Sequence, residues 1–389
     1  MESASPHRIY RVLASAALGL AVALGAVAWT GGAVAKDREA WKKDYVRPSE
    51  IPFPEDNPYT KEKAELGKKL FFDPRLSGAD YISCATCHNP SFSWGDGLPT
   101  GFGHQMTQLG RRTPTILNTA FGELMMWDGR FESLEEQALG PMAAEAEMNQ
   151  ELDAIADELR AIPGYRVLFN VAFPQDGLTI DNVAKAIATF ERTVISGTAP
   201  FDLWIAGEET AISEAAKRGF DLFNGKANCV ACHAGWNFTD DSFHDVGLDD
   251  DDLGRGEHFP DNVKMQHAFK TPTLRNALER APYMHDGSLV TLRNVVEHYD
   301  TGFVERASLS DEVRRLNLSE QEKDDLVAFM ATLSSVDTRI TMPLLPPNDQ
   351  GPAASLRQVS PAAGDSEQDG SSGQNGKCRI DRLHLRRCK

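Results

Sequence analysis

The sequence predicts a mainly α-helical protein built from two related domains in tandem. A motif of the form Cys-x-x-Cys-His occurs twice, as CATCH at 84–88 and as CVACH at 229–233, and similar segments flank both copies in the same order. Elsewhere, apolar residues recur at spacings of three and four, which is the helical period. No segment alternates in the manner of a convincing strand.

Five segments combine this helical period with a Ser or Thr at or near their start, where a hydroxyl group can cap the first turn. We therefore expect helices over residues 60–72, 133–139, 179–196, 212–224 and 319–333. From Pro343 the composition turns to Pro, Gly, Ser, Asn and Gln, which predicts a disordered linker. The chain ends in a basic tail in which Cys378 and Cys388 could close a small disulfide loop.

The flanking segments define an internal duplication. GKKLF (67–71) and GFDLF (219–223) precede the two motifs, and Pro114 and Pro272 each lie fourteen residues before an Asp in the segments that follow. These later segments are RTPTILN (112–118) with MWDGRFESL (126–134), and KTPTLRN (270–276) with MHDGSLVTL (284–292). We expect an N-terminal domain over 36–200, a C-terminal domain over 201–342, and a linker with tail over 343–389.

Residues 1–35 have the features of a secretory signal peptide. A short basic region precedes an uncharged apolar run at 12–28, and the small residues of AVA at 33–35 offer a cleavage site. We expect cleavage near Lys36 and a periplasmic location. The alternative is an uncleaved membrane anchor, because the apolar run is slightly long for a signal peptide.

Three kinds of site use paired cysteines of this form. A zinc ribbon requires its two pairs about 15–20 residues apart and needs no following His. A thioredoxin-type redox motif is expected once, also without the His. Covalent haem c uses all three residues, since two thiols bind the macrocycle and the His reaches the iron. We therefore predict two covalently bound haem c groups, with these attachment residues and iron ligands: Cys84, Cys87, Cys229, Cys232, His88 and His233.

The formal net charge is −17, and a dense acidic stretch covers residues 239–254. This stretch is either a docking face for a basic partner or a cation site, or else a solvated loop, which is the more common case for such a run. We expect no nucleic acid among the partners.

Residues 65–335 resemble the bacterial di-haem cytochrome c peroxidases and their MauG branch. The segments that carry the resemblance are LFFDPRLS, CATCH, MWDGRFESLEEQ, CVACH and APYMHDGSLVTL, in that order along the chain. The resemblance implies two mainly helical, cytochrome c-like haem domains. It also implies that peroxide reacts at the N-terminal haem and that the C-terminal haem passes electrons.

The resemblance assigns roles to four further residues of the N-terminal domain. His104 matches a second axial ligand of the first haem, which leaves when the enzyme is reduced; by itself it is a loop histidine. Trp127 matches a tryptophan between the haems, although a buried core Trp would look the same. Gln137 and Glu147 match the pair that orients peroxide and moves its proton, whereas the residues alone suggest a solvated helix face.

The sequence departs from the peroxidase pattern at the second haem. Tyr299 lies where the peroxidases have a methionine ligand, and this is the MauG arrangement; Met284 and His298 are the rival ligands. A phenolate is a hard anion that stabilises oxidised iron, whereas a thioether favours the reduced state. The family's interdomain calcium is in doubt, because Arg112 replaces an Asn ligand, although carbonyl groups of Arg280 and Pro282 would remain.

Three hypotheses follow. The first is a periplasmic peroxidase that reduces hydrogen peroxide with electrons from a small cytochrome c or a cupredoxin, through the second haem and Trp127. The second is a MauG-like enzyme that uses peroxide to oxidise a residue of a protein substrate. The third is a non-catalytic electron carrier, which would have no reason to keep Trp127, Gln137 and Glu147 in register. A homodimer is left open.

Overall fold

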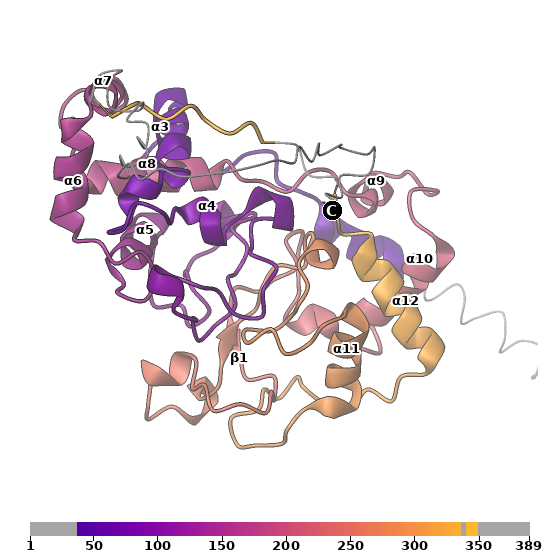
Figure 1. Ribbon diagram of the computed structural model, residues 1–389. Coiled ribbons are helices and arrows are strands. Elements are labelled where there is room, and N and C mark those ends of the chain that lie inside the picture. The colour runs from indigo at the N-terminus through magenta and orange to yellow at the C-terminus, as the bar shows by residue number, and fades with distance from the viewer. Residues whose placement is uncertain (1–36, 336–339, 349–389) are drawn as a thin grey trace, which may run out of the picture. The chain divides into compact units, whose positions relative to one another are not determined.

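The computed structural model describes residues 37–335 and 340–348, and it confirms a mainly α-helical fold (Figure 1). Its only strands in this described part are β1 (Phe243–His244) and β2 (Phe269–Lys270), which pair antiparallel. The α-helices are α3 (Lys61–Phe71), α4 (Cys84–Cys87), α5 (Leu134–Ala143), α6 (Leu152–Ala161), α7 (Pro163–Ala172), α8 (Ile180–Arg192), α9 (Pro200–Ile205), α10 (Glu214–Asn224), α11 (Leu292–Glu297) and α12 (Glu320–Ala331).

The five helices predicted from the sequence are confirmed as α3, α5, α8, α10 and α12. Each begins directly after a hydroxyl residue whose side chain accepts a hydrogen bond from a backbone N–H of the first turn. These capping residues are Thr60, Ser133, Thr179, Ser213 and Ser319. Helices α6 and α7 were not predicted; they adjoin at Ile162, where Pro163 starts the second of them.

Each domain is organised around one close crossing of two helices, α3 with α8 in the first domain and α10 with α12 in the second. A Cβ atom on Gly67 would lie 1.8 Å from the carbonyl oxygen of Ala186, and one on Gly219 would lie 2.0 Å from that of Asp325. The repeated glycine therefore has a physical reason, because only a residue without a side chain allows this approach.

The two cores are separate and differ in composition. Leu70, Phe71 and Phe190 lie in the N-terminal core, together with aliphatic residues of α6 and α8. The C-terminal core is more aromatic, and Phe220 and Phe329 are its central members, with no exposed surface. Burial of this aromatic surface stabilises the C-terminal domain.

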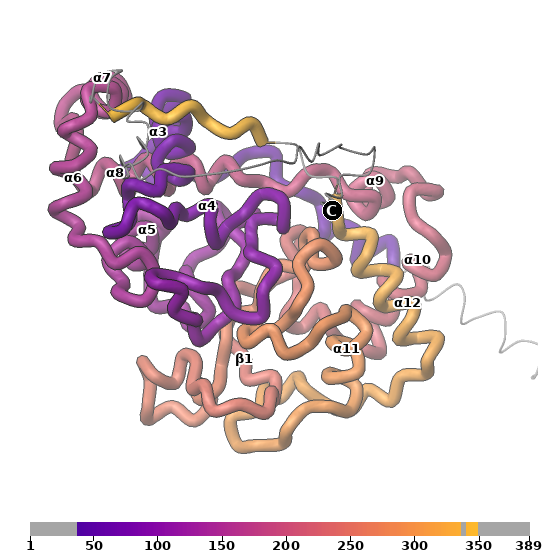
Figure 2. The backbone as a smooth tube through the Cα atoms, in the orientation of Figure 1, coloured from indigo at the N-terminus to yellow at the C-terminus, as the bar shows by residue number. Residues whose placement is uncertain are grey.

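The ends of the described chain cross between the domains (Figure 2). Tyr45 is buried in the C-terminal core, and its hydroxyl donates to Asn224 Oδ1 at 2.7 Å. Conversely, Ile340 packs against the N-terminal core, and Lys69 Nζ donates to the carbonyl of Leu344 at 2.7 Å. Packing thus departs from the divisions expected at 200 and 342 in these two short segments.

The expected signal peptide and the Cys378–Cys388 tail lie outside the described residues. Within 37–335 and 340–348, no helix is both long and apolar enough to cross a membrane.

Candidate functional site: two haem motifs and their junction

The two Cys-x-x-Cys-His motifs have the same local geometry. The backbone N–H of His88 donates to Cys84 O at 2.8 Å, and that of His233 donates to Cys229 O at 2.9 Å. Each motif is therefore wound into one tight turn, which brings both thiols and the imidazole to the same loop. This compactness is what attachment of one macrocycle requires.

Both histidines are oriented through one ring nitrogen. The Nδ1 atom of His88 lies 3.3 Å from Trp94 O, and that of His233 lies 2.9 Å from Phe238 O. A carbonyl oxygen only accepts hydrogen bonds, so Nδ1 carries the proton and Nε2 keeps its lone pair. The backbone thus fixes the tautomer that binds a metal through Nε2.

None of the four motif cysteines forms a disulfide, and their placement fits haem c better than zinc. Burial raises the pKa of Cys87 to about 11 and that of Cys229 to about 12, so neither behaves as a reactive thiolate. Among the described residues, the one cluster with metal-ligand spacing joins Cys232 to Asp240 and His244, and it does not unite the two cysteine pairs. The two cysteine pairs therefore do not form one zinc-ribbon site.

Glu147 lies beside the first motif, as the resemblance implies. Burial raises the pKa of its carboxyl group, and Arg130 opposes this rise. The charge of Glu147 in turn acts on the thiol of Cys87 and helps to raise its pKa. Gln137, on α5, donates from Nε2 to Met126 Sδ at 3.7 Å, so it faces the loop that carries Trp127.

His104 is held in a loop that packs against the Glu147 segment. Its backbone N–H donates to Ala146 O at 3.0 Å, and a Cβ atom on Gly103 would lie 1.9 Å from the same oxygen. The imidazole stacks on Tyr81, and its buried Nδ1 finds no hydrogen-bond partner. This half-buried imidazole with an unused nitrogen differs from an ordinary surface histidine.

Trp127 lies at the junction of the two domains. Its Nε1 donates to Arg112 O at 2.8 Å, and its ring meets the His285 ring edge to face, with 6.4 Å between centroids. Trp127 and His285 occupy equivalent places in the duplication, each directly before the Asp of the Asp-Gly pair. The junction is thus formed by the same position of both repeats.

Tyr299 is placed near the second motif by a π-helical turn (His298–Gly302) that follows α11. Burial raises the pKa of its phenol, and the phenol is near enough to Cys232 and Cys229 for their charges to add to this rise. His298 is turned away, because its Nε2 lies 2.8 Å from Val246 O. Met284 has the left-handed backbone of its counterpart Met126 and remains the rival ligand.

The acidic stretch is neither a free docking face nor a solvated loop over much of its length. Asp245 is buried and forms an ion pair with Arg306, and Asp252 forms one with Arg111. Much of the negative charge is therefore balanced by ion pairs within the protein. A pattern of acidic residues alone could not reveal these pairs.

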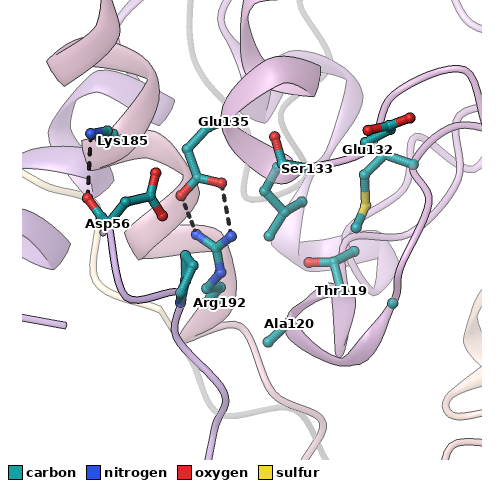
Figure 3. A pocket seen from close by; sticks show the side chains of 12 residues that line it. Asp56, Thr119, Ala120, Glu132, Ser133, Glu135, Lys185 and Arg192 are labelled. Atoms are coloured by element: carbon teal, nitrogen blue, oxygen red, sulfur yellow. Dashed lines mark hydrogen bonds and ion pairs between the residues drawn. The ribbon is translucent and has the colours of Figure 1, made fainter. Parts of the chain in front are cut away.

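A surface pocket between α5 and α8 is unrelated to the motifs (Figure 3). Glu135 accepts two hydrogen bonds from Arg192, at 2.6 and 2.8 Å, and Lys185 Nζ donates to Asp56 O at 3.3 Å. Its lining includes no residue of either Cys-x-x-Cys-His motif. Within this pocket Glu135 and Arg192 form an ion pair, and we assign the pocket a structural role.

This arrangement defines a class of protein: c-type cytochromes with two haem sites and a half-buried carboxyl group whose charge acts on the first motif. A model of the family described as di-haem cytochrome c peroxidase matches residues 61–210, and a cytochrome c model matches 216–334. The chain belongs to the di-haem cytochrome c peroxidase and MauG family, and it is an oxidoreductase of that family.

Named relatives come from both branches of the family. The methylamine utilization protein MauG of Methylorubrum extorquens is 49% identical over 86% of this chain and 96% of its own length. The cytochrome c551 peroxidase of Pseudomonas aeruginosa is 34% identical over 77% of this chain and 86% of its own. Among solved structures, a MauG-like protein associated with microbial copper homeostasis matches with a TM-score of 0.69 and 31% identity, over 75% of this chain and 93% of that one.

Proposed function

We propose that this chain uses hydrogen peroxide at the CATCH site and draws the electrons for its reduction from a residue of a partner protein, in the manner of MauG. The observation that carries the proposal is the place of Tyr299 in the turn after α11, where the charges of both CVACH thiols act on its phenol. The greater identity to a MauG protein than to the named peroxidases supports it. We further propose that both haem c groups are covalently attached, in a chain exported to the periplasm after signal-peptide cleavage.

Glu147 and Gln137 would handle peroxide. Breaking the O–O bond with two electrons and two protons yields two water molecules. Glu147 would take a proton from the near oxygen and return it to the far oxygen, which then leaves as water. Its partly buried position suits this role, because burial raises the pKa of the carboxyl group. Gln137, held by Met126, would orient peroxide through its amide.

Tyr299 would distinguish the second site from that of an electron-entry haem. Bound haem c would supply an iron that gains and loses one electron at a time, and a phenolate ligand favours its oxidised states. Trp127 would be the residue through which electrons cross between the domains, because its ring lies at their junction. An indole at this place would divide the path of the electron between the two haem sites into shorter steps.

A second candidate is a peroxidase that takes its electrons from a small cytochrome c or a cupredoxin. His104 favours it, because the unused, buried Nδ1 and the adjacent Glu147 segment suit a ligand that occupies the first site until reduction. The two candidates share Glu147, Gln137 and Trp127. They differ in where the electrons originate.

The test adds stoichiometric peroxide to the fully oxidised holoprotein, with no electron donor present. We expect visible and electron paramagnetic resonance spectra to show an oxidised state that involves both haems and persists for minutes. The Tyr299→Phe protein, as the matched control, should lose this state. Steady turnover with reduced cytochrome c after pre-reduction, without any persistent oxidised state, would instead establish the peroxidase.

A further inference from the structure

The domain junction is reciprocal. The backbone N–H of Arg112 donates to His285 O at 2.6 Å, and the backbone N–H of Lys270 donates to Trp127 O at 2.8 Å. Arg112 and Lys270 are equivalent in the duplication, since each begins the Arg/Lys-Thr-Pro-Thr segment of its repeat. A backbone N–H of each repeat thus donates to the carbonyl of the junction residue of the other repeat, which is His285 or Trp127.

The side chains of the same two residues repeat this reciprocity. Arg112 Nη2 donates to the carbonyl of Arg280 at 2.5 Å, in the loop that leads to His285. Lys270 Nζ donates to the carbonyl of Leu124, in the loop that leads to Trp127. We call Arg112 and Lys270 the cationic clasp. Each member reaches a carbonyl group of the other domain.

The two members of the cationic clasp differ in how their charge is balanced. Lys270 forms an ion pair with Asp241. Arg112 is only 5% exposed, and among the described residues no carboxylate forms an ion pair with it, although the charge of Asp96 acts on it. Burial lowers the pKa of Arg112, but a guanidinium group keeps its proton in proteins. A fixed positive charge therefore lies at the junction, directed at a carbonyl oxygen.

This geometry does not fit the calcium ion that the resemblance implies at the junction. Calcium requires six to eight oxygen ligands. Arg112 offers no side-chain oxygen, and its guanidinium already binds the Arg280 carbonyl that would serve as a ligand. A divalent cation there would also face the positive charge of Arg112 at close range.

We propose that Arg112 is a built-in cation that replaces a bound metal ion at the domain junction and that positions Trp127. The carbonyl of Arg112 accepts the Trp127 Nε1–H, so any shift of this backbone moves the indole. Lys270 holds the other side of the same contact. The junction of this protein therefore needs no calcium. The consequence for electron transfer rests on the proposed role of Trp127.

The first experiment titrates the holoprotein with CaCl2 by calorimetry and measures its thermal midpoint with CaCl2 or EDTA. We expect no binding heat and the same midpoint in both solutions. Binding of Ca²⁺ to the natural protein, or a midpoint that falls with EDTA, would overturn the proposal. This test needs no catalysis, so it is independent of the proposed function.

The second experiment measures electron transfer between the haems after rapid reduction, without peroxide, in two variants. Arg112→Met should slow this transfer by about tenfold or more, because small displacements of a positioned group have large kinetic effects. Arg112→Lys, which keeps the charge, should retain most of the rate. Equal rates in Arg112→Met and in the natural protein would contradict a positioning role.

The matched control is Arg192→Met. Arg192 is also nearly buried, but its partner is Glu135 within the N-terminal domain, away from the junction. We expect this variant to lower the thermal midpoint and to leave the interhaem rate unchanged. A similar slowing in Arg192→Met would mean that general destabilisation, and not Arg112, explains the effect.

Discussion

The two haem domains share one scaffold and differ at the position that we propose as an iron ligand of the second domain. Both cross two helices at a glycine, and both orient the motif histidine through a backbone carbonyl. Twelve residues after the Gly of the Asp-Gly pair, however, the first repeat has Pro141 and the second has Tyr299. A proline side chain offers no donor atom, so at this position only the second domain could supply a side-chain ligand. The two repeats thus share the parts that would hold the cofactor and differ in this side chain.

The domain junction likewise combines a shared backbone with different side chains. Equivalent positions supply both halves of the contact, yet the residues there are Trp127 in one repeat and His285 in the other. The indole is more easily oxidised than the imidazole, whereas His285 is buried and its Nε2 finds no hydrogen-bond partner. The symmetry of the backbone thus carries an asymmetric pair of side chains.

The largest effect should come from Glu147, whose carboxyl group in the N-terminal domain is half-buried. We expect Glu147→Gln to slow the reaction with peroxide by roughly a hundredfold or more, since general acid–base groups contribute about 10²–10⁴-fold. Stopped-flow mixing of peroxide with the holoprotein measures this. The control is Glu145→Gln, two residues earlier and exposed, which should react normally. Equal slowing in both variants would contradict a role of Glu147 in proton transfer to peroxide.

A pH profile sharpens the same comparison. Burial raises the pKa of Glu147, and Arg130 opposes the rise. The carboxylate must accept a proton, so the rate should fall as the pH drops through a value above that of an ordinary Glu, which is about 4.3. Arg130→Gln should move this fall to higher pH, and Glu147→Gln should abolish it. If neither substitution changed the pH dependence of the rate, another group would be responsible for it.

A smaller effect tests the shared scaffold. Gly67→Ala and Gly219→Ala should each lower the free energy of unfolding by about 1–3 kcal/mol, as overpacked cores do. The added Cβ would meet a backbone carbonyl in both cases. Thermal or denaturant unfolding of the holoprotein measures the change. Gly110→Ala is the control, because nothing lies within 4 Å of its added Cβ. Unequal costs at Gly67 and Gly219 would break the structural equivalence of the two crossings.

Much of this architecture could be predicted from the sequence. Hydroxyl caps and helical periodicity located α3, α5, α8, α10 and α12, and the duplication predicted two domains. The crossing of the chain ends could not be predicted, because residues such as Tyr45 carry no signal for the domain they join. The cationic clasp could not be predicted from the sequence for a related reason. Arg112 and Lys270 were aligned by the repeat, but only the structure shows that each side chain reaches the opposite domain.

The proposal that Tyr299 is the axial ligand of the second haem can be tested directly by spectroscopy. Electron paramagnetic resonance and resonance Raman spectra of the oxidised holoprotein should show a phenolate bound to one haem. Tyr299→Phe should remove this signal and leave the other haem unchanged, whereas Met284→Leu should leave both unchanged. Loss of a ligand in Met284→Leu, with a natural spectrum in Tyr299→Phe, would contradict the account.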